Sequence, residues 1–171
     1  MYGYDRIPVS YLDDSLPLPR TDLALELENQ LRDALVRIGL QEVVSYRYTS
    51  PEKEARILAA GGQPNQSEYL RLLNPLNPER TVLRRSLLAS ALEVLEKNAR
   101  LSDRLALFEI GPVFLPKTGQ TLPEEPGRLA IVMTGLRLPQ AWDRRETAMM
   151  DFYDLKGILE SMLANAHISP V

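Results

Sequence analysis

Three acidic side chains are the strongest candidates for catalysis in this sequence. Asp151 and Asp154 are three residues apart, so a helix would place them on one face, and Glu109 lies inside an apolar run. Carboxylates held together can act as a general acid and a general base. An aspartate at the start of a helix is, however, more commonly its N-cap. We therefore favour capping roles for Asp151 and Asp154, and a free-standing carboxylate-based enzyme is the alternative.

Arg84 and Glu109 form a second candidate pair. Arg84 comes just before a predicted helix, where a cation opposes the helix dipole. Glu109 is flanked by apolar residues of a predicted strand, where an ionised carboxylate is costly unless it is paired. We expect these two side chains to form an ion pair with a structural role, in preference to a ligand contact.

Composition excludes several kinds of site. The 171 residues include no cysteine and a single histidine, His167, so disulfides, thiolate nucleophiles and sulfur-ligated zinc are absent, and we predict no metal site. The net charge of −3 does not supply the positive field that sequence-independent nucleic-acid binding uses. No apolar run approaches the roughly 18 residues of a membrane span, and the first 20 residues do not form a signal peptide. We expect a cytoplasmic protein without a membrane contact.

Helical spacing of apolar residues and capping residues predict four helices. The first is capped by Thr21 and ends at Gly39, whose backbone can adopt the left-handed conformation of a helix terminus. Ser86 is a candidate cap for the third helix and Asp151 for the last. The helices are predicted over residues 21–38, from 51 to the glycine pair at 61–62, over 86–101 and from 151 onward.

Runs of β-branched and aromatic residues predict the strands. Gly111 and Pro112 interrupt one apolar run, which indicates a bend between two strands because proline cannot donate to a ladder. The strands are predicted over residues 41–48, 69–73, 105–110, 113–115 and 128–134. Neighbouring strands without strict alternation with helices favour an α+β fold with a mostly antiparallel sheet flanked by helices. We expect residues 1–19 to be a linker or the tail of a preceding domain, and residues 20–171 to be one core domain.

Several ordered segments resemble the beta subunit of phenylalanyl-tRNA synthetase over nearly the whole chain. They are residues 2–8 (YGYDRIP), 39–46 (GLQEVVSY), 74–88 (NPLNPERTVLRRSLL), 107–114 (LFEIGPVF) and 151–157 (DFYDLKG). The residues that carry the family motif are Asn74, Pro75, Arg84, Ser86, Phe108, Glu109, Gly111, Asp151, Asp154 and Lys156.

The resemblance implies a degenerate copy of the class II aminoacyl-tRNA synthetase core, truncated at its C-terminus. Such a core would carry no catalytic residue and bind no cofactor, and the chain contains no fRxE or GxGxxR segment to hold ATP. The resemblance also implies that the core supports a catalytic alpha subunit in the ATP-dependent attachment of phenylalanine to tRNA, with ATP, magnesium and tRNA(Phe) bound by the whole synthetase.

The helix at 21–38 and the strand after it resemble the dimer-forming first motif of that class. We therefore expect an interface with the alpha subunit at Leu23, Leu27, Leu31, Leu35, Ile38, Val43 and Tyr46. A homodimer of the isolated chain is a further expectation. A regulatory or RNA-binding paralogue of the beta subunit is the alternative function.

Overall fold

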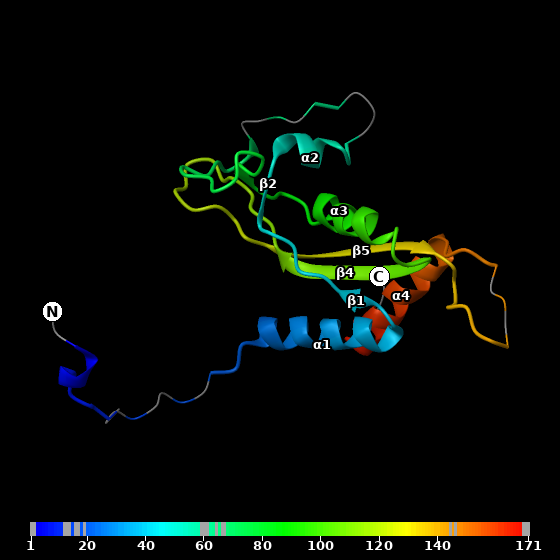
Figure 1. Ribbon diagram of the computed structural model, residues 1–171, viewed down its shortest axis with the longest axis horizontal. Helices are drawn as coiled ribbons and strands as arrows, with labels where there is room; N and C mark the ends of the chain where they lie inside the picture. The colour runs from blue at the N-terminus through cyan, green and yellow to red at the C-terminus, as the bar shows by residue number, and fades with distance from the viewer. Residues whose placement is uncertain are drawn as a thin grey trace.

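The computed structural model describes residues 3–11, 15, 18, 20–58, 62–63, 65, 68–143, 145 and 147–168. The body has three layers (Figure 1): helices α1 and α4 lie on one side of a sheet and helix α3 on the other. Residues 3–11 are exposed and lie away from this body (Figure 1). The helices are α1 (Leu23–Ile38), α2 (Pro51–Ala55), α3 (Leu88–Asn98) and α4 (Phe152–Asn165). The strands are β1 (Gln41–Glu42), β2 (Tyr48–Thr49), β3 (Val82–Leu83), β4 (Arg104–Pro112) and β5 (Gly127–Gly135).

The main sheet has the strand order β1-β4-β5. Strands β4 and β5 pair antiparallel over their full lengths, from Arg104 opposite Gly135 to Pro112 opposite Gly127. Strand β1 pairs parallel to β4, and β2 and β3 form a separate antiparallel pair. The α+β prediction is confirmed, but the main sheet is mixed because β1 runs parallel to its neighbour.

The core fills both faces of the main sheet because the side chains of β4 alternate between them. On one face, Phe108 packs with Leu35 of α1 and Met162 of α4. On the other face, Leu107 packs with Ala91 of α3 and Val132 of β5. The apolar stripes of the helices therefore meet the sheet from opposite sides, as their helical spacing requires.

Helix α1 has the predicted extent, although its cap differs. Asp22, and not Thr21, is the N-cap: its Oδ1 accepts hydrogen bonds from the backbone N–H groups of Ala24 at 3.0 Å and Leu25 at 3.2 Å. Gly39 ends the helix at φ 98°, in the left-handed region where glycine is favoured. Asp22 lies two and three residues before these donors, which is the spacing of an N-cap side chain.

Two strand predictions are corrected. Residues 41–48 are not one strand, since only β1 and β2 at its two ends are paired, and the chain between them turns toward Glu109. Residues 69–73 are not a strand, because this segment makes a single bridge, between Arg71 and Val82.

The predicted break at Gly111 and Pro112 is also wrong. Strand β4 continues through both residues, and Pro112 occupies its last position, where the missing N–H donor removes no ladder bond inside the strand. The chain beyond it stays close to β5, with Val113 donating to the carbonyl of Pro126 at 3.1 Å.

The remaining helices differ from their predicted extents mainly at the ends. Helix α2 ends at Ala55, and Gly61 of its predicted stop lies outside the described residues. Helix α3 is shorter than predicted, and the Oγ of Ser86 accepts a hydrogen bond from the N–H of Leu88 at 3.1 Å. None of the helices in the described part of the chain is long and apolar enough to cross a membrane.

Candidate functional site

An apolar groove runs along the first half of α1. Leu25, Leu27 and Leu31 of the helix form one wall, and Ile110 of β4 and Leu129 of β5 form the other. The groove has a volume of about 560 Å³, and its polar rim is formed by Asp22, Glu28 and Arg128. An apolar centre with a polar rim is the usual arrangement of a protein interaction surface.

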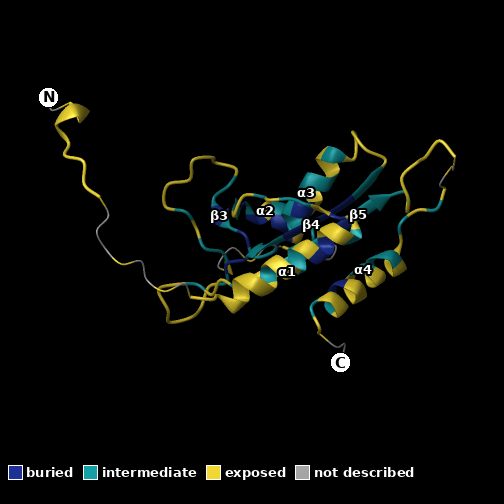
Figure 2. Ribbon diagram, turned by 90° about the horizontal axis from the view of Figure 1, so that it is seen from below, coloured by how far each residue is buried: buried dark blue, intermediate teal, exposed yellow. Residues whose placement is uncertain are grey.

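The leucines at the start of α1 are exposed to solvent. Leu23 is 75% exposed, Leu25 is 53% exposed and Leu27 is 40% exposed. Figure 2 shows the outer face of α1 as exposed along this half of the helix. Burying leucines of this kind against a partner contributes roughly 1.5 to 3 kcal/mol for each side chain. The groove is therefore the candidate functional site.

The structure divides the predicted interface residues between surface and core. Leu35 is fully buried against Phe108, so it stabilises this chain and cannot contact a partner. Leu31 and Ile38 pack against the same core cluster, although Leu31 also reaches the groove. Leu35 therefore belongs to the core of this chain, because the same helical stripe turns toward the sheet in the second half of α1.

The two predicted interface residues beyond α1 lie elsewhere. Val43 packs with Leu107 in the core cluster under α3. Tyr46 is exposed, stacks on Tyr48 with ring centroids 5.2 Å apart, and lies under the guanidinium of Arg80 at 4.7 Å. Neither residue lines the groove along α1.

Leu25, Ile110 and Leu129 line the groove but were missed by the sequence prediction. Leu25 falls outside the main apolar stripe of the helix, and Ile110 and Leu129 come from strands more than 70 residues further along the chain. For Leu25, the available signal was an apolar residue next to the main apolar stripe of the helix. No local pattern indicates that the two strand residues face this helix.

A buried network of charged and polar side chains surrounds the ion pair of Arg84 and Glu109. The Nη1 of Arg84 donates to the Oε1 of Glu109 at 2.5 Å, and both side chains are only 3% exposed. Arg84 also donates through Nε to the carbonyl of Pro112 at 3.0 Å and through Nη1 to the Oγ of Ser45 at 2.9 Å. The predicted ion pair is confirmed, and the contact to Ser45 was missed.

Ser45, which lies between β1 and β2, completes this network. Its Oγ donates to the Oε2 of Glu109 at 2.7 Å, and its backbone N–H donates to Oε1 at 3.3 Å. Gly111 leaves the room that the guanidinium needs, because a Cβ at this position would lie 2.7 Å from Nη2 of Arg84. The charges of Arg84 and Glu109 are thus satisfied inside the fold, and these motif residues hold the segment 43–47 and the strand β4 together.

Glu54 of α2 is a second buried carboxylate, which the sequence prediction also missed. It accepts hydrogen bonds from the backbone N–H groups of Arg85 at 2.9 Å and Ser86 at 3.4 Å, and from the side chain of Tyr69. Burial raises the pKa of Glu54 above its ordinary value, and these hydrogen bonds oppose the shift only in part. Glu54 therefore links α2, the segment at Tyr69 and the start of α3.

The raised pKa of Glu54 predicts a pH-dependent stability. Between the ordinary carboxyl pKa of 4.5 and the higher folded-state pKa, the unfolded chain loses the proton while the folded chain keeps it. The free energy of unfolding should consequently fall as the pH rises through this interval, at most by about 1.4 kcal/mol per pH unit. We expect Glu54→Gln, which cannot ionise, to remove this contribution.

Urea unfolding of both proteins in steps from pH 4 to pH 7 measures the effect. The wild-type free energy of unfolding should decline relative to that of Glu54→Gln as the pH rises. Two curves that stay parallel would show that Glu54 has the same pKa in the folded and unfolded chains.

The two aspartates at the start of α4 form a capping box. Asp151 accepts hydrogen bonds from the N–H groups of Tyr153 and Asp154, and Asp154 accepts one from the N–H of Asp151 at 2.8 Å. This bond, together with Arg137, holds the pKa of Asp154 below its ordinary value. The capping prediction is confirmed, and a carboxyl group with a lowered pKa is poorly suited to be a general acid near neutral pH.

The structure does not bring these aspartates together with Glu109. The start of α4 lies beside Gly135, opposite the first residue of β4, because Met150 donates to the carbonyl of Gly135. Glu109 lies further along β4 and is closed off by Arg84 and Ser45. The three carboxylates proposed for acid and base catalysis therefore have separate structural roles.

The other motif residues also take structural positions. Phe108 is fully buried in the core, and Lys156 is exposed with its Nζ 3.6 Å from Glu160 on the same helix. Asn74 and Pro75 lie exposed in the loop that leads to β3. The motif thus consists mainly of residues that build the sheet, its caps and its connecting loop.

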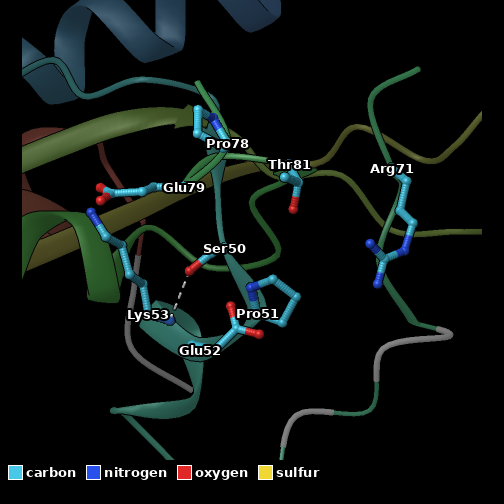
Figure 3. Close-up of a pocket in the computed structure, with 8 residues that line it drawn as sticks. All are labelled: Ser50, Pro51, Glu52, Lys53, Arg71, Pro78, Glu79 and Thr81. Atoms are coloured by element: carbon cyan, nitrogen blue, oxygen red, sulfur yellow. Dashed lines mark hydrogen bonds between the residues drawn. The ribbon is translucent and has the colours of Figure 1, made fainter. Parts of the chain in front are cut away.

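A second hollow of about 530 Å³ lies beside α2 (Figure 3). Ser50, which caps α2 through a 3.2 Å bond from Lys53, lies on one side with Pro51 and Glu52, and Arg71 approaches from the other. The lining contains the carboxylates of Glu52 and Glu79 as well as the cations Lys53 and Arg71. The two carboxylates and the two cations offset each other, so this wall carries no net charge.

Comparison with solved structures defines the class of fold. The chain is similar to pyrrolysyl-tRNA synthetase from Desulfitobacterium hafniense with a TM-score of 0.62 and 23% sequence identity, over 85% of this chain and 48% of that chain. A second structure of the pyrrolysyl-tRNA synthetase of this organism gives a TM-score of 0.59. The fold is therefore the one found in the matched part of these synthetases.

Sequence comparison identifies the family within this class. The family described as Phenylalanyl tRNA synthetase beta chain CLM domain matches residues 7–171, and the chain belongs to this family. It is 39% identical over its whole length to the phenylalanine–tRNA ligase beta subunit of Syntrophus aciditrophicus, and 38% identical over 99% of its length to that of Geobacter metallireducens. The chain spans 21% of the length of each of these two relatives.

Proposed function

We propose that this chain is a non-catalytic, synthetase-like core of a phenylalanine–tRNA ligase beta subunit. It supports the alpha subunit in the ATP-dependent attachment of phenylalanine to tRNA, while ATP, magnesium and tRNA are bound by other parts of the assembled synthetase. The exposed apolar groove along α1, lined by Leu25 and Leu27, is the observation on which this proposal rests.

The roles of the acidic residues support the non-catalytic part of the proposal. Glu109 is enclosed in an ion pair, Glu54 holds the start of α3, and Asp151 and Asp154 cap α4. Each of these carboxylates has protein donors that satisfy it within the fold. A degenerate core that uses its charges for structure is consistent with catalysis by a separate subunit.

The groove supports the interface part of the proposal. Apolar side chains in its centre would give a partner the dehydrated contact that dominates binding energy, and the rim charges Asp22, Glu28 and Arg128 would set its orientation. An alpha subunit that covers the groove would remove the exposed leucines of α1 from water. We therefore place the contact at the first half of α1 and the ends of β4 and β5.

We expect the double substitution Leu25→Glu and Leu27→Glu to weaken binding of the chain to a purified alpha subunit of the same synthetase by about 100-fold or more. Isothermal titration calorimetry measures this affinity. Both leucines are exposed, so the thermal unfolding of the chain should change little. Leu31 is unsuitable for this test, because it also packs against the core.

The matched control replaces two leucines that are exposed elsewhere, Leu101 and Leu122, with glutamate. This control should bind the alpha subunit with wild-type affinity. Equal weakening by both double variants would show that the added charge, and not the groove, changes binding. A wild-type chain that fails to bind the alpha subunit would reject the proposed function.

The non-catalytic part is tested with the purified chain alone. It should support no ATP–pyrophosphate exchange with phenylalanine, and activity should require the alpha subunit. Turnover by the chain without a second protein would contradict this part of the proposal and leave the interface test unaffected.

A further inference from the structure

Helix α1 carries one wall of the groove, and its two halves are held to the protein in different ways. The second half is held by apolar packing, because Ala34 and Leu35 are buried and Leu35 belongs to the core cluster. In residues 23–30, all of which the structure describes, every residue is exposed except Glu28, which is partly buried. Packing against the core cluster therefore begins at Leu31.

Arg32 supplies polar contacts that hold the first half of the helix. Its Nη2 donates to Oε1 of Glu28 at 2.7 Å, one helical turn earlier, and its Nη1 donates to Oδ1 of Asn29 at 2.7 Å. Its Nε donates to Oε1 of Glu42 in β1, also at 2.7 Å. A guanidinium has donors in several fixed directions, so one side chain can hold all three partners. Arg32 thus joins the start of α1 to strand β1.

Strand β1 connects this contact to the opposite wall of the groove. Glu42 pairs with Phe108 of β4, and Ile110, two residues further along β4, lines the groove together with Leu129. The contact between Arg32 and Glu42 therefore links the helix that forms one wall to the sheet that forms the other. Within the described part of the chain, neither Arg32 nor Glu42 lines the groove itself.

Partial burial makes this contact stronger than an ion pair at the surface. The side chains of Arg32 and Glu42 are 27% and 28% exposed, and their charge-assisted hydrogen bond is short. On the same helix, Arg37 and Asp33 are 4.0 Å apart and both are more than two thirds exposed, so water screens their attraction. Loss of the first pair should change how the helix is held, and loss of the second should not.

We propose that Arg32 is a positioning residue of the groove, which fixes the first half of α1 at the distance from β4 and β5 that the partner requires. This inference rests on the proposed function, because the partner is the alpha subunit. In this role Arg32 does not contact the partner. Its effect on binding passes through the positions of Leu25 and Leu27, which line the groove.

Hydrogen exchange of the chain alone tests the positioning of the helix. Arg32→Gln and Glu42→Gln should each raise the exchange rates of the amides in residues 26–31 by about tenfold, and leave those in residues 34–38 unchanged. Arg37→Gln is the matched control, and it should leave the rates in both ranges at their wild-type values. Unchanged rates in residues 26–31, or an equal rise in both ranges, would overturn the proposal.

A double-mutant cycle in the affinity for the alpha subunit tests the effect on binding. By isothermal titration calorimetry, Arg32→Gln and Glu42→Gln should each weaken binding by about tenfold. The double variant should bind no more weakly than either single variant, because each already breaks the contact. Arg32→Lys keeps the charge but has no fork to hold both carboxylates, so it should recover only part of the affinity.

The outcomes separate this inference from the proposed function. If Arg32 contacted the partner directly, Glu42→Gln would bind with wild-type affinity, and this result would overturn the positioning role. Wild-type affinity in both Arg32→Gln and Glu42→Gln would also overturn it, while binding of the wild-type chain would still support the proposed function. A wild-type chain that does not bind the alpha subunit rejects the proposed function and this inference with it.

Discussion

Replacing Glu109 with glutamine is expected to lower the free energy of unfolding by about 3 to 5 kcal/mol. The substitution keeps the size of the side chain but removes the negative charge that faces Arg84. The guanidinium of Arg84 is 3% exposed, so water cannot replace the lost partner. Urea unfolding at neutral pH measures the change, and the fold of the variant is checked by circular dichroism.

The double variant Arg84→Met with Glu109→Gln separates the cost of an unpaired charge from the loss of contacts. Removing both charges should destabilise the protein by less than the sum of the two single substitutions, because no buried ion is left without a partner. Ser45 retains its polar contact to position 109 in this variant. Additive single effects would show that Arg84 and Glu109 do not depend on each other.

The matched control applies the same glutamate-to-glutamine change to an exposed ion pair. Glu124 lies 2.7 Å from Lys117, and both side chains are close to half exposed. Water solvates each charge when the other is removed, so Glu124→Gln should leave the free energy of unfolding almost unchanged. A similar loss in Glu109→Gln and Glu124→Gln would contradict the buried role of Glu109.

Replacing Phe108 with alanine is expected to lower the free energy of unfolding by about 3 to 5 kcal/mol. Phe108 is fully buried between Leu35 of α1 and Met162 of α4, so the substitution removes a large ring and leaves a cavity between three elements. Closing that cavity would require α1 and α4 to move together toward the sheet. Thermal and urea unfolding measure the loss.

Phe152 provides the matched control for this prediction. It is 70% exposed at the start of α4, where its ring contacts Tyr153 edge to face. Because Phe152→Ala opens no cavity, it should cost no more than about 1 kcal/mol. An equal loss of unfolding free energy in Phe108→Ala and Phe152→Ala would contradict a central position of Phe108 in the core.

The ion pair of Arg84 and Glu109 could be predicted from sequence because each residue was out of place in its own element. A cation before a helix and a carboxylate inside an apolar strand both need a partner of opposite charge, and these two satisfy each other. Glu54 is not out of place in its own element, so nothing in the sequence marked it as buried. Its acidic neighbours in a helix are typical of exposed residues, and it is buried only because the segments at Tyr69 and Arg85 close over it.

The sequence by itself determined the four helices, the start of α4 at Asp151 and the turn at Gly39. These features depend on residues within a few positions of one another, through helical spacing, capping bonds and glycine at positive φ. The ordered motifs indicated the family for the same reason, since each motif is a continuous segment. All of these properties are encoded locally.

The tertiary structure alone decided which leucines of α1 face the core and which line the groove. Leu25 and Leu35 have the same chemistry and lie on the same helix, but only Leu35 is buried in the core cluster. Burial is set by segments that are distant in the sequence, here the strands after residue 104 packing on a helix that ends at residue 38. A pattern read along the chain cannot contain that information, because it appears only when the layers pack.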